Sequence, residues 1–130
     1  MKNLDAKIKH FLEERGWDHL RPADLAKSIM IEGAELLELF QWENVSLEEV
    51  KNNPKKVAEI KKELADVLIY ALDMAVLLGL DAENIVMEKL AYIEKKYPAT
   101  LMRKNAKKES GSGGDSEYWR IKKEYRRQGI

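Results

Sequence analysis

Apolar residues recur at intervals of three and four positions along most of this chain, and glycine and proline are scarce before Pro98. This spacing places apolar side chains on one face of a helix, whereas a half-buried strand would alternate every second residue. Capping residues, glycine and proline divide the pattern into a first helix that ends at Gly16, helices over 22–42, 55–78 and 81–97, and a short turn capped by Ser46. The sequence therefore predicts an all-α fold with a four-helix core.

The character of the chain changes after Pro98. The segment ESGSGGDS at 109–116 has the composition of a flexible linker, and the segment that follows it, YWRIKKEYRRQG, is rich in basic residues. Residues 1–102 carry 14 basic and 19 acidic side chains, whereas residues 103–130 carry 9 basic and 4 acidic ones. We therefore expect a helical domain over 1–100, followed by a linker and a basic C-terminal tail over 101–130.

One face of the tail combines apolar and aromatic character. Tyr118, Ile121 and Tyr125 share that face if the segment is helical. The aromatic and basic residues could together touch RNA or DNA, or the apolar face could dock on its own subunit or on a neighbour. The formal charge of zero for the whole chain argues against a general nucleic-acid binder, so we do not expect nucleic acid as a partner.

Composition limits the class of protein further. A chain of 130 residues is the size of one domain, and without cysteine it has no disulfide framework, zinc thiolate site or thiol nucleophile. The N-terminal MKNLDAKIKHFLEERG lacks the apolar core of a signal peptide. The apolar stretch 64–80 is short for a membrane span and contains two aspartates. We expect a cytoplasmic protein with no membrane partner.

Acidic residues of the second predicted helix turn toward apolar neighbours. Glutamates at this spacing are ordinarily a solvated face, and Glu38 fits that interpretation. At about 100° per residue, however, Glu32 and Glu35 fall in a stripe flanked by Ile31 and Trp42. These two carboxylates are therefore expected to face an apolar wall.

The third predicted helix contains acids in an apolar setting. Its residues 64–80 include only two charged ones, Asp66 and Asp73, which predicts burial over most of the surface. Glu63, Asp66 and Tyr70 share one face of this helix. Acids in such a segment require a chemical reason.

Each of the two helices presents carboxylates at positions i and i+3, with Cβ atoms roughly 5–6 Å apart. Antiparallel packing would bring all four together, and at roughly 4 Å and an effective dielectric near 20 each like-charge pair costs about 4 kcal/mol. Protons or a metal must therefore neutralise them. Oxygen ligands without histidine or cysteine favour Mg²⁺ first and Mn²⁺ second over zinc. Such a site suits hydrolysis of a phosphoanhydride.

A carboxylate-bridged di-iron bundle is the chemical competitor, and it expects Glu-x-x-His pairs. Here the residues three before His10 and His19 are Lys7 and Gly16. That signature is absent from the sequence.

The segment Glu32-Gly-Ala-Glu35, continued by LLELFQW, is followed after twenty-seven residues by Glu63-Leu-Ala-Asp66 in KKELADVLIY. This pattern resembles the E-x-x-E…E-x-x-D signature of the MazG-like nucleotide pyrophosphohydrolases, and most closely their small single-domain members of the dCTP pyrophosphatase type. The likeness runs from about residue 17 to residue 98. It implies an all-α catalytic domain that assembles as a dimer or tetramer.

The resemblance also implies Mg²⁺-dependent cleavage of a nucleoside triphosphate between its α and β phosphates, for house-cleaning of the nucleotide pool. The metal ligands and catalytic carboxylates that it implies are Glu32, Glu35, Glu63 and Asp66. The substrate contacts that it implies are Trp17, Trp42, Tyr70 and Lys89. Three more lysines just after KKYP are candidate phosphate contacts: Lys104, Lys107 and Lys108.

This sequence departs from the family at one position. Many relatives have an asparagine four residues after the lysine that corresponds to Lys89, and Ile93 stands there in this sequence. The preferred base and sugar are therefore left open. Two other interpretations also fit the residues. One is a non-catalytic helical module that binds Mg²⁺ and nucleotide, or nucleic acid through its tail. The other is a structural helical oligomer whose acids form salt bridges at an interface.

Overall fold

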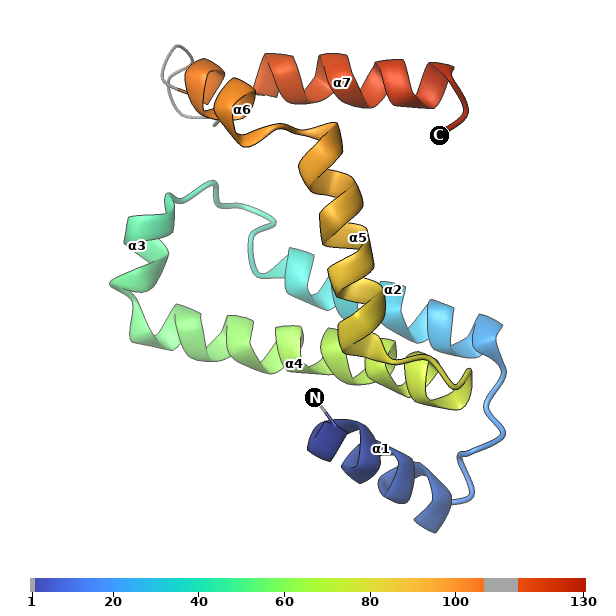
Figure 1. Cartoon of the computed structure of the whole chain (residues 1–130). Helices are drawn as coiled ribbons and strands as arrows, with labels where there is room; N and C mark the ends of the chain where they lie inside the picture. Colours follow the sequence, from blue (N-terminus) through green and yellow to red (C-terminus); the bar gives the residue numbers. More distant parts are fainter. Residues whose placement is uncertain (1, 107–114) are drawn as a thin grey trace. The chain divides into compact units, whose positions relative to one another are not determined.

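The computed structural model describes residues 2–106 and 115–130 and confirms the all-α fold (Figure 1). Within these ranges there are seven helices and no strand. The helices are α1 (Lys2–Glu14), α2 (Pro22–Glu38), α3 (Leu47–Lys51), α4 (Pro54–Leu77), α5 (Ala82–Lys96), α6 (Ala99–Ala106) and α7 (Asp115–Arg127). They form two compact units, which divide between Ala82 and Glu83.

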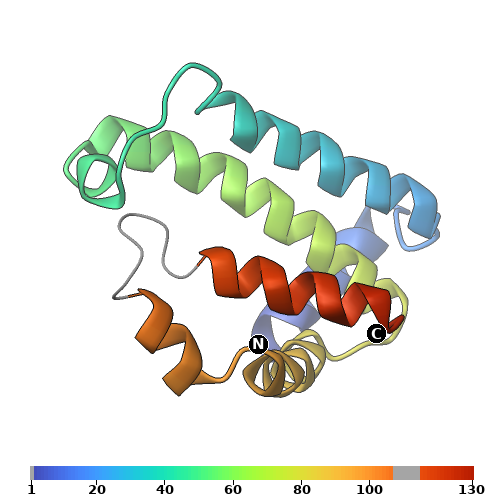
Figure 2. The ribbon, with the colours of Figure 1, turned by 90° about the horizontal axis from the view of Figure 1, so that it is seen from above.

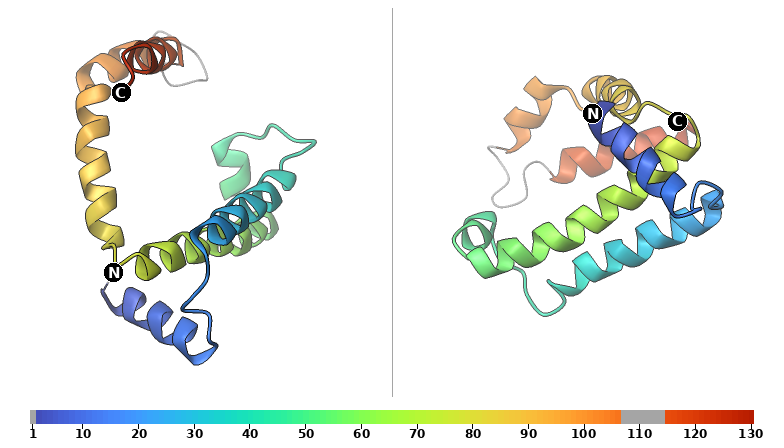
Figure 3. Two further views of the ribbon diagram at one scale, coloured as in Figure 1. Left: turned by 90° about the vertical axis from the view of Figure 1, so that its right-hand side faces the viewer. Right: turned by 90° about the horizontal axis from the view of Figure 1, so that it is seen from below.

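The first unit is organised around the pairing of α2 with α4. Figure 2 shows the two helices side by side and running in opposite directions, and the views in Figure 3 agree. α1 and α3 also pack on α4. The core between these helices contains Ile8, Leu12, Leu25 and Ala75, all less than a tenth exposed. The antiparallel pairing that the acidic motif requires is therefore present.

Local signals set most helix ends in this unit as the sequence predicts. Pro22 and Pro54 occupy the first turns of α2 and α4, where a missing N–H costs no hydrogen bond. The side chains of Ser46 and Asn53 accept hydrogen bonds from backbone N–H groups three residues on, each at 3.2 Å. Gly79 adopts a φ of +68° just beyond α4, a conformation that favours glycine.

The second helix is shorter than the sequence predicts, because it ends at Glu38 and not near Trp42. A contact distant in sequence accounts for the difference. The Lys56 side chain of α4 donates a hydrogen bond to the Leu39 carbonyl, and its Nζ lies 2.9 Å from a carboxylate oxygen of Glu43. The same Nζ lies 4.9 Å from the centroid of the Phe40 ring. Lys56 thus joins the end of α2 to the start of α4.

The second unit contains most of α5 together with α6 and α7. The predicted apolar face of the tail is confirmed, since Ile121 is only 6% exposed and the Tyr97 and Tyr118 rings stack at 5.0 Å. Tyr125 meets Tyr92 edge-on at 6.2 Å. The tail face therefore docks on its own chain.

α6 was not predicted, because a span of only eight residues gives little periodic signal. Most of the expected glycine-rich linker lies outside the described residues. That a catalytic domain ends near residue 100 stays a prediction, since packing units do not define activity. Among the described residues, none of the helices combines the length and apolar character that crossing a bilayer requires.

Candidate metal-binding site and adjoining cavity

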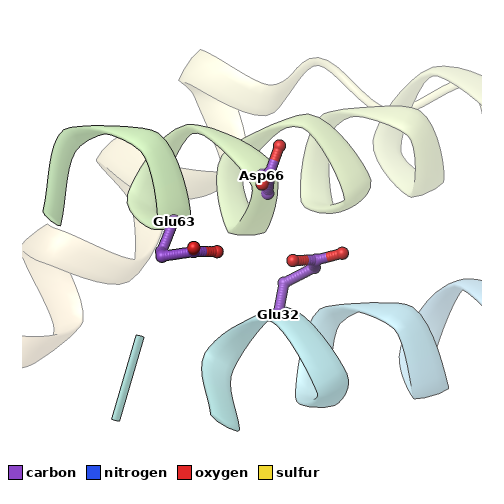
Figure 4. A group of neighbouring side chains, drawn as sticks. All are labelled: Glu32, Glu63 and Asp66. Atoms are coloured by element: carbon purple, nitrogen blue, oxygen red, sulfur yellow. The ribbon is translucent and has the colours of Figure 1, made fainter. Parts of the chain in front are cut away.

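Three of the four predicted carboxylates converge between α2 and α4. One carboxylate oxygen from each of Glu32, Glu63 and Asp66 lies within 4.8 Å of the others. Figure 4 shows Glu32 reaching from α2 toward Glu63 on α4, with Asp66 one turn further along α4. All three side chains are half-buried. We call Glu32, Glu63 and Asp66 the carboxylate cluster.

Glu35 lies beside the carboxylate cluster but is more exposed than its members. Hydrogen bonding with Glu32 and repulsion from its charge raise the pKa of Glu35. Burial, followed by hydrogen bonding with Glu35 and repulsion from it, raises the pKa of Glu63. Glu35 and Glu63 are therefore each harder to ionise than an isolated glutamate, as the predicted repulsion between neighbouring acids requires.

The carboxylate cluster fits a hard divalent cation. One oxygen each of Glu32 and Glu63 is buried without a hydrogen-bond partner. A buried carboxylate oxygen without a donor is unfavourable unless a proton or cation occupies the space before it. Mg²⁺ and Mn²⁺ prefer oxygen ligands of this kind. These side chains thus supply both the ligands and the negative charge that such an ion needs.

A cavity of about 360 Å³ adjoins the carboxylate cluster and shares Asp66 with it. Two of the predicted aromatic contacts, Trp17 and Tyr70, line this cavity. Trp17 is 48% exposed and meets Phe11 edge-on, with ring centroids 5.9 Å apart. The walls are largely apolar and aromatic, which suits a flat ring that enters beside a charged group.

Among the other predicted contacts, only Trp42 belongs to the same unit as this cavity. Trp42 is 88% exposed and is not among the lining residues. Lys89 and Lys104 belong to the second unit, where both are exposed, and Lys89 Nζ lies 4.6 Å from the centroid of the Tyr92 ring. Lys107 and Lys108 lie outside the described residues. The roles of these five side chains stay predictions.

Several lining residues were not recognised from the sequence. Phe11 had the spacing of a core residue, and Asp24 and Ser28 had the ordinary appearance of a polar helix face. Asp73 alone gave a signal, as a charged residue in an apolar segment. The fold places Asp73 in the cavity wall with 5% of its surface exposed.

The described unit is all-α and has paired acidic helices beside an aromatic cavity. Comparison with known families identifies the class of protein that these features define. The sequence pattern of the MazG-like family matches residues 27–111. The chain belongs to the MazG-like family.

Individual relatives agree with this assignment. The chain is similar to human dCTP pyrophosphatase 1, with 33% identity over 100 residues, which cover 75% of this chain and 59% of that protein. The rat protein of the same name is 34% identical over 98 residues, or 74% of this chain and 58% of its own. The chain therefore spans less than two thirds of the length of these curated relatives.

A solved structure of a pyrophosphatase from Archaeoglobus fulgidus matches the fold with a TM-score of 0.66. The two sequences are 39% identical, and the match covers 75% of this chain and 92% of the archaeal one.

Proposed function

We propose that this chain is a Mg²⁺-dependent nucleoside triphosphate pyrophosphohydrolase. It would cleave (d)NTP to (d)NMP and pyrophosphate, in house-cleaning of the nucleotide pool. The observation that carries the proposal is the convergence of Glu32, Glu63 and Asp66 within 4.8 Å beside an aromatic cavity. The names of the relatives, dCTP pyrophosphatase and pyrophosphatase, support the same reaction class.

In this proposal, Glu32, Glu35, Glu63 and Asp66 hold Mg²⁺, for which Mn²⁺ is a possible substitute. The bound ion would neutralise the triphosphate and supply a polarised water. Glu35 is the carboxylate best suited to take the proton from the attacking water. Its exposure leaves it accessible to that water.

The cavity would receive the nucleoside. Trp17 and Tyr70 on its wall can pack against a base or sugar, while Asp66 extends from the cavity to the carboxylate cluster. The remaining predicted residues stay proposed substrate contacts in the assembled enzyme: Trp42, Lys89, Lys104, Lys107 and Lys108. The lysines would act on the phosphates as point charges.

We also propose that the chain forms a homo-oligomer, a dimer or tetramer, in the cytoplasm. Leu64 and Leu68 on α4 are 44% and 53% exposed, and they border a shallow apolar hollow with Val57 and Ile60. Such a patch on a helix favours contact with another copy. Light scattering during size exclusion should give two or four times the 15.0 kDa of one chain, and Leu68→Glu should lower that mass. A wild-type monomer would contradict the oligomer.

The reaction is tested with a panel of nucleoside triphosphates and Mg²⁺, with products resolved by chromatography. We expect monophosphate and pyrophosphate from the wild type. Glu63→Gln should lose this activity and remain helical by circular dichroism, while Glu13→Gln on the exposed face of α1 should keep it. Orthophosphate as the product would show that the wrong bond was assigned. Nucleotide binding without turnover would indicate the non-catalytic module.

A further inference from the structure

Asp73 is the buried charged residue of the described core, at 5% exposure. It lies on α4 and lines the cavity beside the carboxylate cluster. Its Oδ1 atom is buried and has no hydrogen-bond partner. A group of this kind is uncommon in a folded protein and calls for a chemical explanation.

The apolar surroundings of Asp73 argue against a purely structural role for this acid. Leu25, which is 2% exposed, and Ile69 belong to the same cavity wall, and burial raises the pKa of the Asp73 carboxyl. An apolar side chain at this position would avoid the penalty of an unpaired polar group. The carboxyl is therefore a liability to the empty chain that a bound donor would remove.

Asp73 lies at a distance from the carboxylate cluster that suits a nucleoside. It follows Asp66 by seven residues, which places both on one face of α4 about 10.5 Å apart along the axis. Tyr70 lies between them and lines the same cavity. A nucleotide whose phosphates approach Asp66 would therefore extend its base toward Asp73.

The other acid of the cavity wall lacks these properties. Asp24 has 59% of its side chain exposed and pairs with Lys27 at 3.7 Å. Its charge is solvated and partly satisfied without a ligand, so it gives little discrimination. Asp73 is the polar group that a base would meet away from water.

We propose that Asp73 determines base specificity by accepting a hydrogen bond from an exocyclic amino group of the base. The substrate class would be triphosphates of amino-bearing bases such as cytosine, in preference to uracil and thymine. Uracil presents a carbonyl oxygen in place of the amino group of cytosine, and that oxygen cannot donate a hydrogen bond to the ionised carboxylate of Asp73. This inference rests on the proposed function, because it takes the cavity as the nucleoside site.

The sharpest test compares cytosine with uracil on the same sugar and phosphate. Binding of dCMP and dUMP in the presence of Mg²⁺ is measured by calorimetry, and the kcat/KM values for dCTP and dUTP are measured in parallel. We expect the wild type to favour cytosine over uracil by at least about tenfold in both measurements. A buried hydrogen bond that only one of the two ligands can make should give a difference of this size.

Two substitutions separate recognition from folding. Asp73→Leu removes both oxygens and should reduce the cytosine preference at least about tenfold while raising thermal stability. Asp73→Asn should improve dUMP binding, because its amide can donate to a carbonyl. Asp5→Leu is the matched control, since Asp5 also has a buried oxygen without a partner but does not line the cavity. It should leave the cytosine-to-uracil ratio unchanged.

Equal binding of both nucleotides by the wild type, or of neither, would overturn the inference. So would an unchanged ratio in Asp73→Leu, or an equal loss for both bases together with a lower melting temperature. Hydrolysis without base discrimination would overturn this inference alone. Base discrimination in binding without hydrolysis would support it and contradict the proposed function.

Discussion

Glu35 and Glu63 illustrate how neighbouring side chains set the chemistry of single residues. Both have a pKa above the ordinary value of 4.5, Glu35 mainly through Glu32 and Glu63 mainly through burial. An acid with a raised pKa in the folded chain binds protons more tightly there than in the unfolded chain. Its contribution to stability is therefore greatest below pH 4.5 and decreases as the pH rises through the raised value.

The pKa values of two other glutamates shift in the opposite direction. Hydrogen bonds from Arg127 and Gln128 lower the pKa of Glu124 to about 2, and Arg120 lowers the pKa of Glu117. Their contributions are present above pH 4.5 and are lost as the pH falls. The pH dependence of the carboxylate cluster must therefore be measured as a difference between variants.

We expect Glu63→Gln to gain stability relative to the wild type as the pH rises above about 4.5, when metal is removed with a chelator. The substitution removes one charge from a group in which like charges repel. Urea unfolding at a series of pH values measures the difference. Glu13→Gln, which removes an exposed charge on α1, is the control for the loss of a carboxyl, and a pH-independent difference for Glu63→Gln would contradict the raised pKa.

At the scale of helices, two glycines of the first unit have opposite roles. Gly33 lies within α2, and no atom beyond the local backbone of the helix lies within 4 Å of the position that a Cβ would occupy, so alanine would fit there. Gly79 follows α4 at a φ of +68°, where an L side chain is strained. The first glycine weakens a helix, and the second ends one.

Gly33→Ala should therefore stabilise the metal-free chain by about 0.5–1 kcal/mol, and Gly79→Ala should destabilise it by about 1–2 kcal/mol. Urea unfolding of both variants provides the measurement, and each serves as the control for the other. A loss of stability in Gly33→Ala would show that a partner or another segment covers this face of α2.

The sequence predicts a helix end well where the cause is local. Ser46, Pro54 and Gly79 act through their own backbone or a neighbour three residues away, and each marks a boundary that the structure confirms. The end of α2 depends on Lys56, seventeen residues beyond Leu39, and helical periodicity carries no information about that contact. The prediction near Trp42 was wrong for this reason.

The candidate site also has one part that the sequence predicts and one part that it does not. The spacing of Glu32, Glu63 and Asp66 within two helices was sufficient to predict that they meet, once antiparallel pairing was assumed. The cavity brings Phe11 of α1 together with residues of α2 and α4, so it depends on tertiary packing. Apolar periodicity could not distinguish a cavity wall from an ordinary core.

At the scale of the whole molecule, the basic tail contributes to a packed unit. Its helix α7 buries Ile121 and sets Tyr118 against Tyr97 of the same chain. Its basic residues Arg120 and Arg127 pair with Glu117 and Glu124 on α7 itself. These contacts show that α7 packs within its own chain, and the expectation of no nucleic-acid partner stays a prediction.

Ile121→Ala should destabilise the docking of α7 by about 2 kcal/mol, because it removes buried apolar contacts. Hydrogen exchange should accelerate in α7 and remain unchanged in α2, which belongs to the first unit. Ile130→Ala is the control, since Ile130 is 65% exposed. Unchanged exchange in α7 would contradict the docking.

The central claim is that the carboxylate cluster holds a divalent cation. The most direct measurement is thermal unfolding at neutral pH during titration with Mg²⁺, for the wild type, Glu63→Gln and Glu13→Gln. At a hundredfold excess over its Kd, a specific ion stabilises the folded chain by about 2.7 kcal/mol. We expect the melting temperature to rise in the wild type and in Glu13→Gln and to stay flat in Glu63→Gln. A flat response in the wild type, or an equal rise in all three, would contradict the claim.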